Sequence, residues 1–108
     1  METFGFEEMQ KIQHELQEKY KDKWPQLSPR QGRSTLLWMM SEAGEIADII
    51  KKKGDESIMM DPVVRQHFVE EMCDVMMYFN DLMICYNISA EEIERVYRAK
   101  HRRNMERW

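Results

Sequence analysis

The sequence has few of the residues that interrupt regular structure. Its 108 residues include only 4 Gly and 3 Pro, so few positions force a turn or break a helix. No apolar run is long enough to cross a membrane, and we expect neither a membrane partner nor a secretory signal. No internal repeat, low-complexity segment or strand pattern is present. Long helices in a single domain spanning residues 1–108 are therefore expected.

Cysteine and histidine are also scarce, which excludes several kinds of site. Cys73 and Cys85 lie on one predicted helix, roughly 18 Å apart along its axis at ~1.5 Å per residue. A disulfide within the chain is excluded at that separation, and two buried free thiols indicate a cytoplasmic protein. The three histidines, His14, His67 and His101, show no metal-ligand spacing, and without a Glu-x-x-His motif a di-iron bundle is excluded.

Apolar and charged residues are plentiful and helically spaced. Hydrophobic residues make up 43% of the chain and charged ones 33%, with 11 Met and a formal net charge of −4. This composition is typical of a globular helical protein with an adaptable interior. The charge is uneven, because the segment from Arg95 to Arg107 carries six basic residues and one acid, Glu106. An acidic middle with a basic end suits binding of a metal-complexed polyanion, although a basic helix can equally be a solvated face.

Periodicity and capping signals predict four helices. They are expected at 5–22, from Ser28 to about residue 53, at 62–86, and from Ser89 to the end, with loops at 23–28 and 55–61. Four helices joined by short connections favour an all-α, four-helix antiparallel bundle. The third helix is apolar almost all round, so we expect the bundle to be completed by oligomerisation, as a homodimer or a dimer of dimers.

Two pairs of acids stand out within these helices. Glu42 and Glu45 are three residues apart, and so are Glu71 and Asp74, which places each pair on one helix face. For a single such pair a solvent-facing position is the better interpretation, but Asp74 is surrounded by apolar residues and an embedded acid is usually paired or metal-bound. Oxygen ligands without Cys or His favour Mg²⁺, or Mn²⁺ in its place.

The same motifs carry a resemblance to a known family. Glu-Ala-Gly-Glu (42–45), twenty-five residues, and Glu-Met-Cys-Asp (71–74) resemble the ExxE…ExxD signature of the MazG-like all-α nucleoside triphosphate pyrophosphohydrolases, which are related to dimeric dUTPases and dCTP pyrophosphatases. Lys100, Asn104 and Arg107 are similar to that family's C-terminal pattern. The resemblance covers roughly residues 33–108. Ser41, Cys73 and Asp81 depart from the common pattern, which leaves the preferred base open.

The resemblance implies hydrolysis of an NTP or dNTP to the monophosphate and pyrophosphate. It implies Mg²⁺ ligands at Glu42, Glu45, Glu71 and Asp74, which suits activation of a bound water. Glu42 or Glu45 is expected to double as general base. The resemblance also implies that Lys100, Asn104 and Arg107 bind phosphate or sugar oxygens.

Several other residues are weaker candidates. Asp81 lies on the same face as Asp74, and could bind metal or sugar. Trp24 and Trp38 could stack on a base, although core packing is the better expectation, and Gln13 is a candidate for reading a base edge. Lysines 51–53 could touch the triphosphate, although a solvated helix end is the better expectation.

A non-catalytic helical module is the alternative. It would bind nucleotide, nucleic acid or a partner protein through the basic last helix. That interpretation leaves the embedded acids unexplained, so we expect a triphosphate substrate and no nucleic acid.

Overall fold

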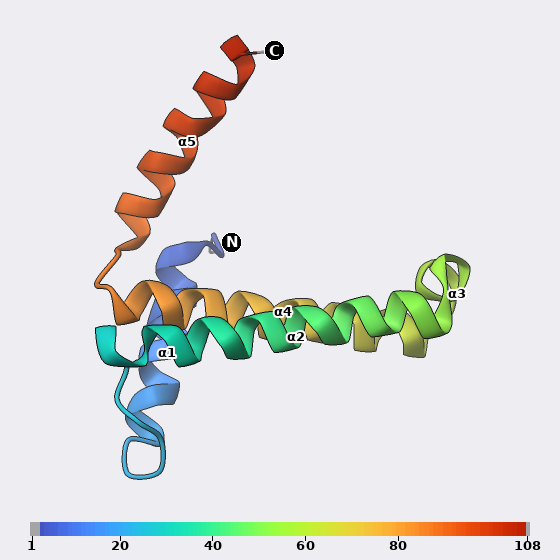
Figure 1. Cartoon of the computed structure of the whole chain (residues 1–108), viewed down its shortest axis with the longest axis horizontal. Helices are drawn as coiled ribbons and strands as arrows, with labels where there is room; N and C mark the ends of the chain where they lie inside the picture. Colours follow the sequence, from blue (N-terminus) through green and yellow to red (C-terminus); the bar gives the residue numbers. More distant parts are fainter. Residues whose placement is uncertain (1–2, 108) are drawn as a thin grey trace.

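The computed structural model describes residues 3–107, and those residues are helical with no strand (Figure 1). The elements are α1 (Phe6–Lys19), the short 3-10 helix η1 (Pro29–Gln31), α2 (Gly32–Lys53), α3 (Asp55–Met60), α4 (Pro62–Cys85) and α5 (Ala90–Arg107). The predicted all-α class is confirmed. Within the described residues no helix combines the length and apolarity needed to span a membrane.

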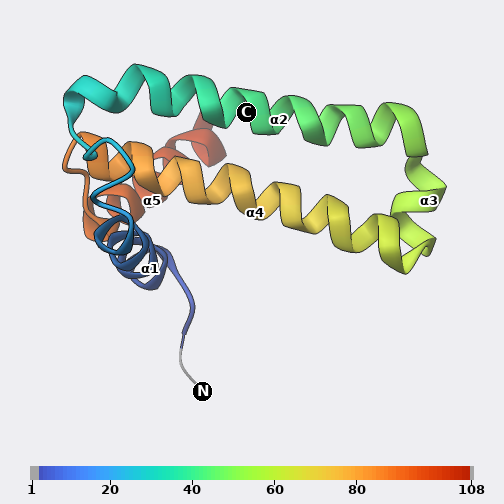
Figure 2. The ribbon, with the colours of Figure 1, turned by 90° about the horizontal axis from the view of Figure 1, so that it is seen from below.

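A long antiparallel pair, α2 and α4, forms the body of the molecule (Figures 1 and 2). The short helix α3 joins the pair at one end, and α1 packs across α4 at the other. The last helix, α5, extends away from the pair and makes its helix contacts with α1 (Figure 1). The four long helices therefore do not close into a bundle within one chain. Completion of a bundle by oligomerisation stays a prediction.

Helix ends follow the capping residues that the sequence contains. Asp61 Oδ1 accepts hydrogen bonds from the backbone N–H groups of Val63 (2.9 Å) and Val64 (3.4 Å), and a proline opens α4. Ser89 Oγ accepts from the Glu92 N–H at 3.0 Å at the start of α5. Gly54, with φ 83°, ends α2. These three predicted boundaries are confirmed.

Other boundary predictions are wrong, each for a local reason. The segment 55–61, expected to be a loop, contains α3, because buried Ile58 anchors a helical turn against α4. The first helix stops at Lys19 rather than at residue 22. The chain turns directly after Lys19, and the rings of Tyr20 and Trp24 stack across that turn with centroids 4.6 Å apart. Ser28 makes no side-chain cap, and α2 begins at Gly32 after the 3-10 turn.

The interior of a single chain is small. The buried apolar residues are Ile49, Ile58, Met83 and Cys85, and Gln13, Thr35, Asn80 and Asp81 are buried polar residues. Cys73 is exposed, so the expectation of two buried thiols holds only for Cys85; both are free. Large apolar side chains on α2 and α4 remain exposed, among them Leu37 (57%) and Met40 (59%).

Candidate metal centre and adjoining cavity

Three of the four predicted metal ligands lie together between α2 and α4. Glu42 and Glu45 from α2 and Glu71 from α4 each offer an oxygen within 4.8 Å of the others. The three-residue spacing puts the first two on the α2 face that meets α4. The structure thus brings together acids that are separated in the sequence by residues 46–70. This cluster is the candidate metal centre.

The carboxylates of this cluster perturb one another. The pKa of Glu42 is raised from 4.5 to about 7, first because burial disfavours the charged form. Hydrogen bonds to Glu71 and Glu45, which the protonated acid makes, raise the pKa further, and so do the two neighbouring negative charges. Three carboxylates this close repel one another, although Glu45 is exposed and Glu42 and Glu71 are only partly buried, and a divalent cation would offset that repulsion.

Glu71 carries the most specific indication of cation binding in this cluster. Its side chain is only 14% exposed, and its Oε1 lies 3.2 Å from Nε2 of His67, one turn earlier on α4. Its second oxygen, Oε2, is buried and has no hydrogen-bond partner. An unpaired buried carboxylate oxygen is costly in a folded protein. Its position among two other carboxylates fits a hard cation such as Mg²⁺.

Asp74, the fourth predicted ligand, lies beside the cluster rather than within it. The three-acid group does not include it, and its half-buried side chain lines the neighbouring cavity. Tyr78, one turn further along α4, lines the cavity and is also close enough to the acid cluster to feel its charge. Its pKa is raised by burial and then by the charges of Glu42, Asp81 and Asp74. Asp74 is thus placed between the cluster and the cavity.

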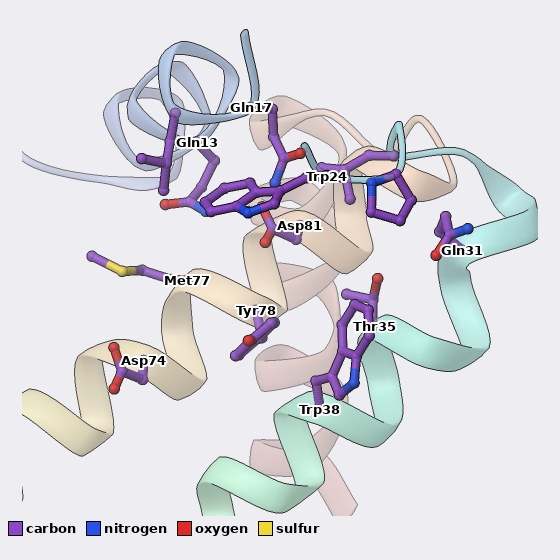
Figure 3. Close-up of a pocket in the computed structure, with 13 residues that line it drawn as sticks. Gln13, Gln17, Trp24, Gln31, Thr35, Trp38, Asp74, Met77, Tyr78 and Asp81 are labelled. Atoms are coloured by element: carbon purple, nitrogen blue, oxygen red, sulfur yellow. The ribbon is translucent and has the colours of Figure 1, made fainter. Parts of the chain in front are cut away.

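The cavity has a volume of about 380 Å³ and lies between α1, the segment after it, α2 and α4 (Figure 3). That volume is within the usual range for small-molecule sites. Its walls combine aromatic and apolar side chains with several polar ones. They are Gln13, Leu16, Gln17, Trp24, Pro25, Leu27, Gln31, Thr35, Trp38, Asp74, Met77, Tyr78 and Asp81.

Two indole rings form part of these walls instead of packing in the core. Trp24 is 40% exposed and Trp38 is 48% exposed, so the expectation of core packing is wrong for both. Trp24 is fixed by stacking on Tyr20, and Trp38 lies against Tyr78 with ring centroids 6.3 Å apart.

Asp81 and Gln13 form the polar end of the cavity. Gln13 Nε2 donates a hydrogen bond of 2.8 Å to Asp81 Oδ1, and the two residues are 3% and 7% exposed. Burial raises the pKa of Asp81, while the Gln13 hydrogen bond and the charge of His14 favour the ionised form and oppose that shift. Both residues were weaker candidates for ligand binding in the sequence, and the structure places them together in the cavity wall.

The predicted phosphate-binding residues are not brought to the acids within one chain. Lys100 and Asn104 line a shallow hollow on α5, the helix that extends away from the α2–α4 pair, and Arg107 is on the same helix (Figure 1). A different hollow adjoins the acid cluster and is lined by Lys52 and Lys53 together with Glu45 and Glu71. The lysines at the end of α2 are exposed, as expected of a solvated helix end, and two of them also lie beside the candidate metal centre.

Several residues of this region were not singled out by the sequence. His67 precedes Glu71 by four residues, and Tyr78 follows Asp74 by four, so helical spacing from a known acid could have found both. Gln17 has the same relation to Gln13. Gln31 and Thr35 had no such signal, because only the packing of η1 and α2 against α4 places them at the cavity.

The chain was compared with protein families, curated proteins and solved structures, and no relative was found. No family model matches the chain, and neither a curated protein nor a solved structure matches it significantly.

Proposed function

We propose that the chain is a Mg²⁺-dependent nucleoside triphosphate pyrophosphohydrolase. The observation that carries the proposal is the buried, unpaired Oε2 of Glu71, which lies in a three-carboxylate cluster beside an aromatic cavity. The resemblance of the two acidic motifs to the MazG-like signature supports the same reaction class. We further propose that the substrate is an NTP or dNTP and that the protein acts in the cytoplasm on surplus or noncanonical nucleotides.

The acids of the cluster have distinct tasks in this proposal. Glu42, Glu45 and Glu71 hold the cation, with Asp74 as the fourth ligand at the edge of the cavity. Mg²⁺ bound there would neutralise charge on the triphosphate and lower the pKa of a coordinated water. One carboxylate of the Glu42/Glu45 pair accepts a proton from the attacking water. The water oxygen forms a bond to the α-phosphorus, and the bond to the bridging oxygen breaks, releasing pyrophosphate.

The phosphates need cationic partners near the acids. Lys52 and Lys53 already line the hollow that adjoins Glu45 and Glu71, and ammonium groups bind phosphate oxygens well. Lys100, Asn104 and Arg107 would reach a site only if α5 packs on a second copy of the chain. The proposed homodimer or dimer of dimers would allow this.

Exposed apolar surface supports self-association. On α2 and α4 the side chains of Leu36, Leu37, Met40, Met72 and Met76 are 41–59% exposed. Apolar patches of this kind on a small protein usually mark an interface. Covering them with the same face of another copy would give a closed, isologous dimer.

The proposal is tested by measuring pyrophosphate and orthophosphate release from a panel of NTPs and dNTPs, with Mg²⁺ and with EDTA. Pyrophosphate release that requires Mg²⁺ is expected. Glu71→Gln should abolish it, whereas Glu70→Gln, a change in the exposed neighbouring acid, should leave it near the wild-type rate. Orthophosphate release, or equal rates for the two variants, would contradict the proposal.

A second candidate function is favoured by one observation only. No residue of α5 is buried, and this helix, which carries the basic residues of segment 95–107, extends away from the α2–α4 pair (Figure 1). Such a helix could bind an acidic macromolecule. Steep salt dependence of binding to duplex or single-stranded nucleic acid, without any nucleotide turnover, would favour this module over the enzyme.

A further inference from the structure

Asp81 gives the aromatic cavity one chemically selective group. It is a charged side chain only 7% exposed, and it lines a space large enough for a nucleobase. Its Oδ1 accepts the Gln13 hydrogen bond at 2.8 Å, which fixes the orientation of the carboxylate. Gln13 is itself 3% exposed and cannot easily move away. A buried and oriented acceptor of this kind discriminates between ligands more sharply than an exposed one.

The aromatic residues define where a flat ligand would lie. Figure 3 shows Asp81 directed into the space between Trp24 on one side and Tyr78 and Trp38 on the other. Both indoles are partly exposed, and one face of Trp24 stacks on Tyr20, so a planar ring would lie on the remaining exposed surface of the two indoles. Stacking on aromatic side chains tolerates every base, because each base has a π-face. Selection among bases must therefore come from the polar group at their edge.

We propose that Asp81 makes this cavity select nucleobases that carry an exocyclic amino group over those that carry a carbonyl at the same position. An amino group donates a hydrogen bond to the carboxylate. A carbonyl at that place would instead face it oxygen to oxygen, leaving two buried acceptors unpaired. The inference rests on the proposed function, because the base belongs to the nucleotide whose phosphates reach the acids. Asp74 and Tyr78 lie between the cavity, where the base would bind, and the acid cluster, where the phosphates would bind.

Two pairs of nucleotides carry this difference. Uracil has a carbonyl where cytosine has an amino group and also gains a proton on the adjacent ring nitrogen, and hypoxanthine differs from adenine in the same way. Sites built to hydrogen-bond a ligand group reject analogues that lack it by large factors, about 10⁴–10⁵ in well-evolved enzymes. For one carboxylate with water access through the cavity mouth we expect a preference of about 30–100-fold.

The test uses the full chain and nucleoside monophosphates, which require no turnover. Titrations of CMP, UMP, AMP and IMP are followed by quenching of tryptophan fluorescence, in wild type, Asp81→Asn and the control Asp55→Asn. Asp55 is an exposed acid in the first turn of α3, outside the cavity. Wild type and the control should bind CMP over UMP and AMP over IMP. In Asp81→Asn, whose amide can donate to a carbonyl, each ratio should fall at least tenfold.

The wild-type ratios decide the inference even if Asp81→Asn does not fold. Equal binding within each pair, or no quenching by any of the four nucleotides, would overturn it. Amino selection that survives unchanged in folded Asp81→Asn would also overturn it. Pyrophosphate release with no preference for amino-bearing bases would overturn base selection by Asp81 but not the proposed function. A preference for amino-bearing bases without any turnover of triphosphates would overturn the proposed function but not the base selection.

Discussion

Replacing Glu42 by Gln should make the protein more stable at pH 8, although it removes a proposed metal ligand. The pKa of Glu42 is raised from 4.5 to about 7, chiefly by burial and then by Glu71 and Glu45. The folded protein therefore holds a proton that the unfolded chain releases above about pH 4.5. Stability is lost as pH rises from the unfolded value toward the folded one, and above pH 7 the loss is complete. Gln cannot ionise, so the variant avoids this loss.

The size of the effect follows from the same shift. A pKa raised from 4.5 to about 7 corresponds to about 3 kcal/mol at ~1.4 kcal/mol for each pH unit. Glu42 is partly exposed, and solvent screening reduces the gain to about 1–2 kcal/mol. Near pH 4, where the wild-type carboxyl is protonated in both states, the two proteins should differ by less than about 0.5 kcal/mol.

Urea unfolding followed by far-ultraviolet circular dichroism measures this difference. It should be done in EDTA at a fixed protomer concentration, since self-association would also change the apparent stability. Glu70→Gln is the matched control, because Glu70 lies on the same helix and is exposed. A variant Glu42→Gln that is less stable than wild type at pH 8, or equally shifted at pH 4 and pH 8, would refute the reasoning.

Three further predictions concern the acids and a helix cap. Mg²⁺ at millimolar concentration should raise the melting temperature of wild type and of Glu70→Gln but not of Glu71→Gln. An equal rise in all three proteins would show that Mg²⁺ does not bind at the acid cluster. Glu71→Gln should lower pyrophosphate release at least ~10³-fold in a coupled assay, and a loss below tenfold would make Glu71 dispensable. Asp61→Ala should cost about 1 kcal/mol in urea unfolding, because Val63 and Val64 lose their cap, and Asp61→Asn should cost less; equal costs would contradict the capping role.

Local signals in the sequence were sufficient for the four long helices and for several of their ends. Asp61 before a proline, Ser89 and Gly54 act within one turn of the chain, so the residues that define these boundaries are adjacent in sequence. Helix α3 was not predicted, because it is stabilised by the tertiary packing of Ile58 against α4. Local propensity does not report such contacts.

The acid cluster was predictable and the cavity was not. Three-residue spacing within a helix fixes a shared face, so Glu42 and Glu45 were expected to act together, and the antiparallel return of α4 adds Glu71. The cavity depends on how α1 crosses α4 and on where the segment after it places Trp24. No sequence period encodes that crossing. The same limit explains why Lys100 and Asn104 were expected near the acids, whereas the direction of α5 separates them in one chain.

The central claim is that Mg²⁺ held by these acids directs water to the α-phosphorus of a nucleoside triphosphate. Turnover in water enriched in heavy oxygen, followed by mass spectrometry of both products, tests it most directly. The account predicts one heavy oxygen in the nucleoside monophosphate, none in pyrophosphate, and no reaction in EDTA. Heavy oxygen in pyrophosphate or orthophosphate, or no turnover of any triphosphate with Mg²⁺, would contradict it.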